Sequence, residues 1–258
     1  NLSKVRYSLD AEYVQNNKPL VILVEPQLGE NIGAVARAML NCGLDQLRLV
    51  RPRDGWPNPA ADAMASGAIS VLEKIKIFEQ TRDAVCDLHA VFAATARRRD
   101  LEKKVVTPRQ AAKLFFKTTH AKNNIGLLFG PERSGLGNDD IALSDIVINV
   151  PLNPKFSSLN LAQAVLLIGY EWFQASLTQD TDNRRWGSSE LSTIGEREYF
   201  YSRLENHLSE AGFLYPQHLA PTICRNLRAM FNKAALTNQE IRTLHGVVTA
   251  LSNHTPQR

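Results

Sequence analysis

Up to Pro151, short apolar runs alternate with longer stretches in which apolar residues return every three or four positions. Short runs bounded by turn residues are typical of buried strands, and the longer spacing is typical of amphipathic helices. The predicted strands are Leu20–Glu25, Leu47–Arg51, Lys74–Phe78, Ala90–Thr95, Ile125–Gly130 and Asp145–Pro151. The predicted helices are Asn31–Asn41, Pro59–Ser66, Thr81–Leu88, Pro108–Thr118, Asn138–Leu143 and Ser158–Leu177. This alternation predicts an α/β fold with a mostly parallel, doubly wound sheet.

The pattern changes after Thr178, where a polar stretch reads as a linker. Three further helices are predicted beyond it, and Thr237 to Glu240 forms a capping box for the last of them. These helices are Thr193–Ala211, Leu219–Asn232 and Asn238–Leu251. We therefore expect a first domain at 1–178 that includes an N-terminal tail at 1–17, a linker at 179–190, and a small all-helical C-terminal extension at 191–258.

Composition narrows the class of protein. The chain has 258 residues, of which 44% are hydrophobic, so it can bury a full core. Its three cysteines are too few and too scattered for a disulfide framework, and no metal site is expected. The longest apolar stretch, Leu161 to Phe173, is too short to cross a bilayer, and no signal-peptide pattern opens the sequence. We expect a cytoplasmic protein without a membrane partner.

Positive charge gathers in one segment. The net charge of the chain is +4, but Arg97 to Lys122 holds nine basic and two acidic residues, so this segment alone carries +7. Such a segment is typical of a surface that contacts nucleic-acid phosphates, although a solubilising face has the same composition. The candidate RNA-binding residues are Arg97, Arg98, Arg99, Lys103 and Lys104.

The common nucleotide and hydrolase fingerprints are absent. Gly29 and Gly33 do not complete the dinucleotide motif, and Leu136 stands where a P-loop requires lysine. A Gly-x-Ser-x-Gly elbow is also missing, which argues against an ordinary α/β hydrolase.

Three short motifs follow predicted strands and carry the remaining candidate chemistry. They are Asn31/Gly33/Arg37, then Gly130/Glu132/Gly135, then Ser158/Leu159/Asn160. Each has an ordinary explanation: Asn31 and Ser158 suit helix N-caps, Gly130 suits a turn, and a helical arginine is usually a solvated charge.

Taken together and in this order, the motifs resemble those of the SpoU/TrmH family of SPOUT-class RNA ribose 2′-O-methyltransferases. The segments Phe129–Leu136 and Asn153–Ala164 most resemble the TrmJ branch, which methylates the pyrimidine ribose at position 32 of the tRNA anticodon loop. The resemblance covers about residues 18–252. Its nearer alternatives are another tRNA or rRNA site, or a catalytically idle RNA-binding member of the fold.

The resemblance implies a C-terminal trefoil knot, which fold rules alone would not predict. In the family, three knot loops hold S-adenosylmethionine as the cofactor. Small residues there let the backbone approach an adenine edge. The positions that match these loops are Ala94, Thr95, Ala96, Gly130, Val150, Ser157, Ser158 and Leu159.

The resemblance also implies the catalytic residues and the assembly. Arg37 would act on the ribose 2′-hydroxyl, either as a base or as an electrostatic clamp. The clamp is favoured because a guanidinium is a very weak base. Asn31 would orient Arg37 or the ribose, Glu132 would hold the knot loop or Arg37, and Ser158 and Asn160 would position the methionine end and the loop. The implied partners are tRNA and a second copy of the chain, joined as a homodimer through the knotted domain.

Overall fold

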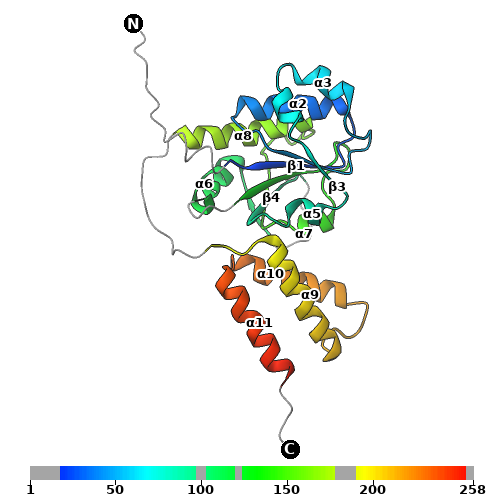
Figure 1. Cartoon of the computed structure of the whole chain (residues 1–258), viewed down its shortest axis with the longest axis vertical. Helices are drawn as coiled ribbons and strands as arrows, with labels where there is room; N and C mark the ends of the chain where they lie inside the picture. The colour runs from blue at the N-terminus through cyan, green and yellow to red at the C-terminus, as the bar shows by residue number, and fades with distance from the viewer. Residues whose placement is uncertain (1–17, 97–102, 120–123, 178–189, 254–258) are drawn as a thin grey trace, which may run out of the picture.

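The computed structural model describes residues 18–96, 103–119, 124–177 and 190–253. Within these ranges seven strands form one parallel sheet in the order β3-β2-β1-β6-β4-β7-β5 (Figure 1). The strands are β1 (Leu20–Val24), β2 (Leu47–Val50), β3 (Lys76–Phe78), β4 (Ala90–Ala94), β5 (Lys104–Val106), β6 (Ile125–Phe129) and β7 (Ile146–Ile148). Because all pairs are parallel, every strand ends at the same edge of the sheet, called here the carboxyl edge; the opposite one is the amino edge.

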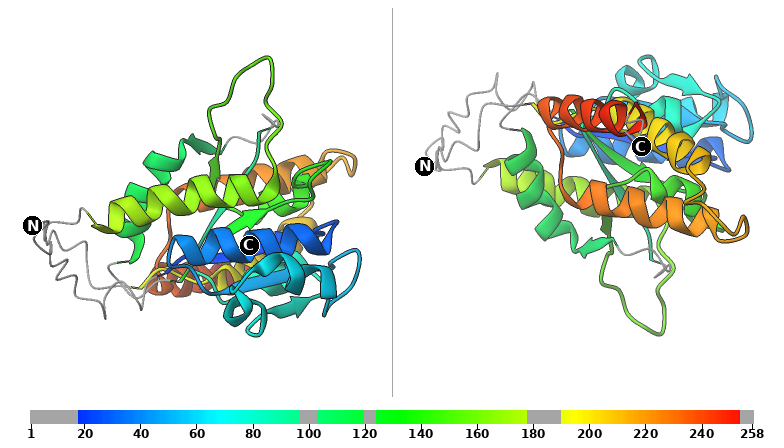
Figure 2. Two further views of the ribbon diagram at one scale, coloured as in Figure 1. Left: turned by 90° about the horizontal axis from the view of Figure 1, so that it is seen from above. Right: turned by 90° about the horizontal axis from the view of Figure 1, so that it is seen from below.

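Helices cover both faces of this sheet. They are α2 (Gly29–Asn41), α3 (Pro59–Ala65), α4 (Ile69–Leu72), α5 (Thr81–Val85), α6 (Pro108–Thr119), α7 (Asn138–Ala142), α8 (Leu161–Leu177), α9 (Ile194–Glu210), α10 (Ala220–Lys233) and α11 (Asn238–Ser252). Helices α2, α3, α4, α6 and α8 share one apolar core with alternate strand residues such as Val21 and Leu23. Helices α5 and α7 share a second core with the intervening residues, such as Ile22 and Val24. Figure 1 shows the sheet between these layers, and Figure 2 shows the molecule from the side of α2 and α8 (left) and from the side of the C-terminal helices (right).

The C-terminal helices form a small unit of their own, centred on Phe200, Tyr201, Ile241 and Val248. This unit joins the sheet at the amino edge. At the start of α9, Ile194 N donates to Leu88 O at 2.7 Å, and the next residue donates to Cys86 O at 2.9 Å. Figure 1 shows the three helices on the side of α5 and α7, away from α2 and α8.

The predicted α/β fold with a parallel sheet and a helical C-terminal region is confirmed, with several corrections. Strand β5 and helix α4 were not predicted. Asn31 does not cap its helix, because α2 begins at Gly29 and its N-cap residue is Leu28. Ser158 does not cap α8 either, since that helix begins at Leu161. The knot stays a prediction, and the tail at 1–17 and most of the linker at 179–190 lie outside the described residues.

No helix in the described ranges combines the length and the apolar character needed to cross a membrane.

Candidate functional site

Three loops meet at the carboxyl edge because the strands that precede them are neighbours. Strands β6, β4 and β7 lie side by side in the sheet, with β1 next to β6. The loops that follow them begin at Gly130, Thr95 and Asn149, respectively. In parallel sheets, ligands bind in the crevice outside this edge. The loops predicted to hold a cofactor are therefore next to one another.

A polar network ties all three sequence motifs together at this edge. The Asn31 amide Nδ2 donates to Glu132 Oε1 at 2.6 Å, and Gln27 N donates to Glu132 Oε2 at 3.0 Å. The Asn160 amide Nδ2 donates to Asn31 Oδ1 at 3.5 Å. Helix α2, the loop after β6 and the start of α8 are thus joined through side chains that lie more than 100 residues apart in sequence.

Asn160 has a second function as the cap of α8. Its Oδ1 accepts from Ala162 N at 2.8 Å, and its own N–H donates to Gln163 Oε1 at 3.2 Å. A side-chain oxygen in this position satisfies a free N–H of the first helical turn. The same residue therefore fixes the start of α8 and the position of Asn31.

Gly130 is required for packing within the site. A Cβ added there would lie 2.3 Å from Leu136 N and 2.5 Å from Gly135 C, so the loop after β6 folds back directly onto this residue. Gly135 has a φ of +65°, a conformation that a residue with a side chain rarely adopts. Gly33 has a different role, because its Cβ would meet Ala61 O of α3 at 2.2 Å.

Arg37 lies on α2 with its side chain exposed. In the described part of the chain it makes no hydrogen bond or ion pair. Six residues separate it from Asn31, which places the two on different faces of the helix. Asn31 and Glu132 contact each other and not Arg37, so of the predicted alternatives the structure has neither residue orienting the guanidinium, and a role of Asn31 at the ribose and of Glu132 in holding the loop stay predictions.

The predicted cofactor residues all lie at the carboxyl edge. Thr95 is held by its backbone, whose N–H donates to Ile148 O at 3.0 Å and whose carbonyl accepts from the Asn149 amide at 3.2 Å. Ala94, Thr95, Gly130, Val150 and Leu159 are partly buried, whereas Ala96, Ser157 and Ser158 are exposed.

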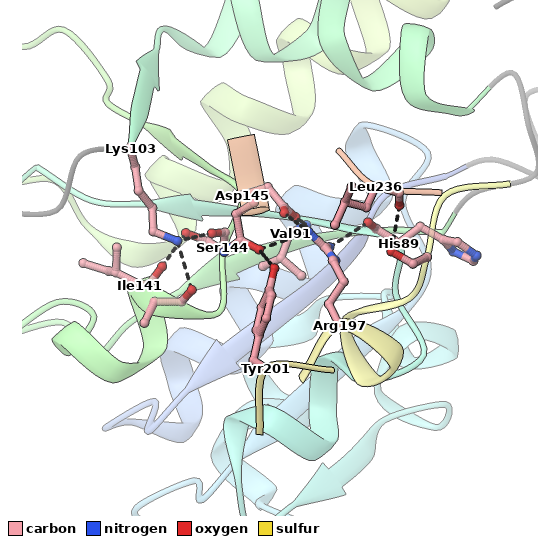
Figure 3. Close-up of polar contacts among 12 residues, drawn as sticks. His89, Val91, Lys103, Ile141, Ser144, Asp145, Arg197, Tyr201 and Leu236 are labelled. Atoms are coloured by element: carbon pink, nitrogen blue, oxygen red, sulfur yellow. Dashed lines mark hydrogen bonds and ion pairs between the residues drawn. The ribbon is translucent and has the colours of Figure 1, made fainter. Parts of the chain in front are cut away.

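Of the five candidate RNA-binding residues, the structure describes Lys103 and Lys104. Arg97, Arg98 and Arg99 lie outside the described residues, and Lys104 is exposed on β5. The expectation that Lys103 is an exposed side chain is wrong, because its ammonium donates to the carbonyls of Ala142 and Ser144 instead of facing solvent (Figure 3). Burial lowers the pKa of Lys103 to about 8. Lys103 therefore does not lie on an exposed face, and RNA binding by these residues stays a prediction.

Sequence reasoning missed three residues of this region. Gln27 and Asn149 hold Glu132 and Thr95 through the contacts given above. Arg53, in the loop after β2, donates its backbone N–H to Pro26 O at 3.1 Å and has an exposed side chain. The Asp54 carboxylate raises the pKa of Arg53, and Glu132 adds to this effect. No sequence motif marks these residues, because their importance comes from the contacts.

Among the described residues, no group of three or more histidine, cysteine or acidic side chains could hold a metal ion.

Comparison with known proteins agrees with this geometry. Residues 18–170 match the family model of the SpoU rRNA Methylase family, and residues 195–258 match that of the C-terminal domain of tRNA methyltransferase TrmJ. A relative named tRNA (cytidine/uridine/adenosine-2′-O-)-methyltransferase TrmJ, from Pseudomonas aeruginosa, is 32% identical over 237 residues, which cover 89% of this chain and 91% of the relative.

Solved structures extend the likeness to the fold. The crystal structure of TrmJ from Z. mobilis ZM4 has a TM-score of 0.81 and 47% identity, and the match covers 92% of this chain and 100% of that one. The SpoU methyltransferase AviRb from Streptomyces viridochromogenes, solved in complex with the cofactor AdoMet, is 19% identical with a TM-score of 0.51 over 64% of this chain and 60% of that one, which shows the shared fold alone. Sequence, fold and motif geometry agree: the chain belongs to the SpoU methylase family.

Proposed function

We propose that this protein transfers a methyl group from S-adenosylmethionine to the 2′-oxygen of a ribose in tRNA. The observation that carries the proposal is the Asn31–Glu132–Asn160 network, which joins all three family motifs at the helix that carries the exposed Arg37. Membership of an RNA methylase family and the TrmJ relatives support the reaction and the class of RNA.

The loops at the carboxyl edge fit the cofactor. Val150 and the run Ser157–Leu159 have backbone N–H groups that donate to no acceptor within the described part of the chain, so they are free to bind an adenine edge or a carboxylate. Gly130 has no side chain and Ala94 has only a methyl group, so neither blocks such an approach. When bound, the cofactor supplies an electrophilic methyl carbon on a sulfonium.

Arg37 is the residue proposed to act on the ribose. Its guanidinium is exposed and unpaired among the described residues, so it can form hydrogen bonds to both a 2′-oxygen and an adjacent phosphate. A guanidinium stays protonated at any ordinary pH, which favours stabilisation of the developing alkoxide over removal of the proton. The hydroxyl proton would then pass to solvent or to the substrate phosphate.

Asn31, Glu132 and Asn160 are proposed as positioning residues. Their side chains satisfy one another, which leaves little of their hydrogen-bonding capacity for a substrate. Their effect is to hold α2, and therefore Arg37, at a fixed distance from the loop after β6. Ser158 remains a candidate contact for the methionine end because its side chain is exposed.

Two finer statements belong to the same proposal. The methylated nucleotide is the pyrimidine at position 32 of the anticodon loop, supported by the likeness of the motifs to the TrmJ branch. The active form is a homodimer through the knotted domain, supported by the apolar side chains Leu40, Leu166 and Leu167, which are exposed on α2 and α8. Light scattering at micromolar concentration should give twice the mass of one chain, and a monomer would contradict the dimer.

The test of the proposal is single-turnover methyl transfer by Arg37→Lys and Arg37→Ala across pH. Loss of one preorganised donor typically costs about 10²–10³ in rate. Arg37→Lys should therefore retain a trace of activity and Arg37→Ala almost none, while S-adenosylmethionine affinity stays near wild type in both. Arg242→Ala, at an exposed site on α11, is the control and should be fully active.

Three outcomes would change the proposal. Recovery of Arg37→Lys at raised pH, to wild-type rates, would identify the residue as a base. Full activity of Arg37→Ala would remove it from the mechanism. Absence of S-adenosylmethionine binding in the wild type would leave a catalytically idle RNA-binding protein. For the position, a tRNA with a 2′-deoxy pyrimidine at position 32 should accept no methyl group, and transfer to it would place the target elsewhere.

A further inference from the structure

A cavity of about 280 Å³ lies at the amino edge, where the sheet meets the C-terminal helices. Phe92 and Ile146 line it from the sheet, and Leu191, Ala229 and Leu236 line it from the C-terminal unit. Protein interiors rarely contain voids much larger than one water molecule. A space of this size, walled by two separately folded parts, is large enough to hold a ligand, and it lies at the opposite edge from the methylation site.

The cavity is lined by a buried ion pair. The Arg197 side chain is 4% exposed, and its Nη1 donates to Asp145 Oδ1 at 2.5 Å (Figure 3). The Asp145 carboxylate also accepts from Val91 N at 2.8 Å. Arg197 Nη2 donates to His89 O at 3.1 Å. The charge of Asp145 is therefore already balanced by one arginine.

A second cation, Lys103, lines the same cavity, and among the described residues it forms no ion pair with a carboxylate. Its ammonium is bonded to two backbone carbonyls, Ala142 O at 2.9 Å and Ser144 O. Glu198 is the next carboxylate that influences it, but Arg228 and Arg82 already pair with Glu198 at 2.8 and 3.5 Å. Together, the charges of Arg197, Asp145 and Lys103 next to the cavity therefore sum to one positive charge.

One donor of a residue that lines the cavity is also unsatisfied. Arg197 Nε is buried and has no hydrogen-bond acceptor in the described part of the chain. Buried polar groups are nearly always paired, and buried charges are paired or neutralised. The depressed pKa of Lys103 agrees with this imbalance, because burial lowers it by more than the carboxylates of Asp145 and Glu198 raise it. Two exposed lysines, Lys104 and Lys233, also line the cavity.

We propose that this cavity is an anion site that takes a phosphate group, held by the Lys103 ammonium, with the positive charge of Arg197 next to it. A phosphate offers several charged acceptor oxygens, which suit an ammonium in a positively charged surrounding. The phosphate belongs either to a free phosphate or nucleotide or to the RNA backbone. The RNA source rests on the proposed function, whereas the site itself does not.

Calorimetric titration of the full chain with inorganic phosphate tests the site without cofactor or tRNA. Chloride at matched ionic strength is the blank. We expect saturable binding to the wild type, at least tenfold weaker binding to Lys103→Met, and affinity within a few-fold of wild type for Lys103→Arg. Lys113→Met, an exposed lysine on α6, is the matched control and should bind as the wild type does. Unchanged S-adenosylmethionine affinity in each variant shows that the fold is intact.

A second measurement follows the pKa of Lys103 itself. Bound phosphate should raise the pKa of Lys103, seen by NMR titration of its side-chain resonances with and without phosphate. No saturable binding to the wild type, or equal binding to Lys103→Met and Lys113→Met, would overturn the proposal.

Titration with tRNA then separates the two sources. If the phosphate comes from the RNA backbone, Lys103→Met weakens tRNA binding and reduces its salt dependence by about one phosphate. If it comes from a free anion, tRNA affinity is unchanged while phosphate binding is lost. Failure of methyl transfer in the Arg37 experiment would leave the phosphate result untouched, so the two proposals fail independently.

Discussion

At the residue scale, Glu132 is held by two N–H donors from the segment that follows β1: one is the backbone of Gln27 and the other is the side chain of Asn31. A carboxylate that accepts two short hydrogen bonds has little rotational freedom, and such charge-assisted bonds are stronger than neutral ones. The loop after β6 is therefore fixed to the start of α2. Because of this contact, the fold itself fixes the distance between Arg37 and the loops proposed to hold the cofactor.

Gly130 provides the first prediction at this scale. Gly130→Ala should lower the free energy of unfolding by about 1–3 kcal/mol or more, because the added Cβ would overlap the backbone of Leu136 and Gly135. Urea denaturation measures the change. Gly246→Ala is the control: nothing lies near its Cβ on the exposed side of α11, so it should raise stability by up to about 1 kcal/mol. Equal effects of the two variants would show that the site has room for a side chain at Gly130.

Lys103 provides a pH-dependent prediction. Its pKa in the folded protein is about 8, below the ordinary value of 10.5, so the unfolded chain binds more protons between these values. The Lys103 contribution to stability is therefore least favourable below pH 8 and improves as the pH rises toward about 10.5. The free energy of unfolding of the wild type relative to Lys103→Met should increase over this window. A difference that is independent of pH would mean that the ammonium is solvated.

At the element scale, the hydrophobic pattern predicted the sheet well because its central strands are buried on both faces and read as continuous apolar runs. Strand β5 was not predicted because it has only three residues, two of them exposed. In the described sheet it pairs with β7 alone. The start of α2 was misplaced because Asn31 looks like a cap. Its side chain instead bonds Glu132, a contact between distant segments that no local pattern contains.

Part of the candidate site was also predictable from the sequence. The three motifs indicated which loops matter, and parallel strand order then places those loops side by side. Burial of Lys103 was not predictable, because its acceptors are backbone carbonyls about 40 residues away. The sequence shows that the segment is basic, but only the fold shows which of its charged side chains face solvent.

The joint between α9 and the sheet gives the prediction at the element scale. Arg197→Ala should lower the free energy of unfolding by about 3–5 kcal/mol, because it leaves the largely buried Asp145 carboxylate without its cation. Adding Asp145→Asn should recover part of this loss. Arg225→Ala is the control, since Arg225 bonds only Thr222 on its own helix, and its effect should be within about 0.5 kcal/mol. A loss as small as that of the control would show that Arg197 does not hold the C-terminal helices in place.

At the scale of the whole molecule, the candidate methylation site and the C-terminal helices lie at opposite edges of the sheet. Asn31 and Glu132 are at the carboxyl edge, whereas Arg197 and Asp145 are at the amino edge. The basic segment connects the two: it begins after Ala96, at the end of β4, and Lys103 stands just before β5 at the other edge. Any RNA bound along this segment would pass from one edge toward the other.

The salt dependence of tRNA binding tests that segment. Replacing Arg98 and Arg99 by alanine should weaken binding similarly for different tRNA sequences and should flatten the plot of affinity against salt by about one phosphate per arginine removed. Lys74→Ala, at an exposed site before β3 and so at the end of the sheet opposite β5, should change neither quantity. An unchanged slope in the double variant would mean that these arginines only aid solubility.

If one RNA contacts both the candidate site and the C-terminal helices, the separation of the two edges sets a minimum size for that RNA. Strand β4 has five residues, which span about 16 Å at roughly 3.3 Å each. A stem-loop fragment that covers only the carboxyl edge could reach Arg37 and still leave the C-terminal helices without a contact. Longer RNA would gain affinity once it bridges this distance. The contribution of the C-terminal helices would then depend on the length of the RNA offered, and trimming the substrate would imitate deletion of the extension.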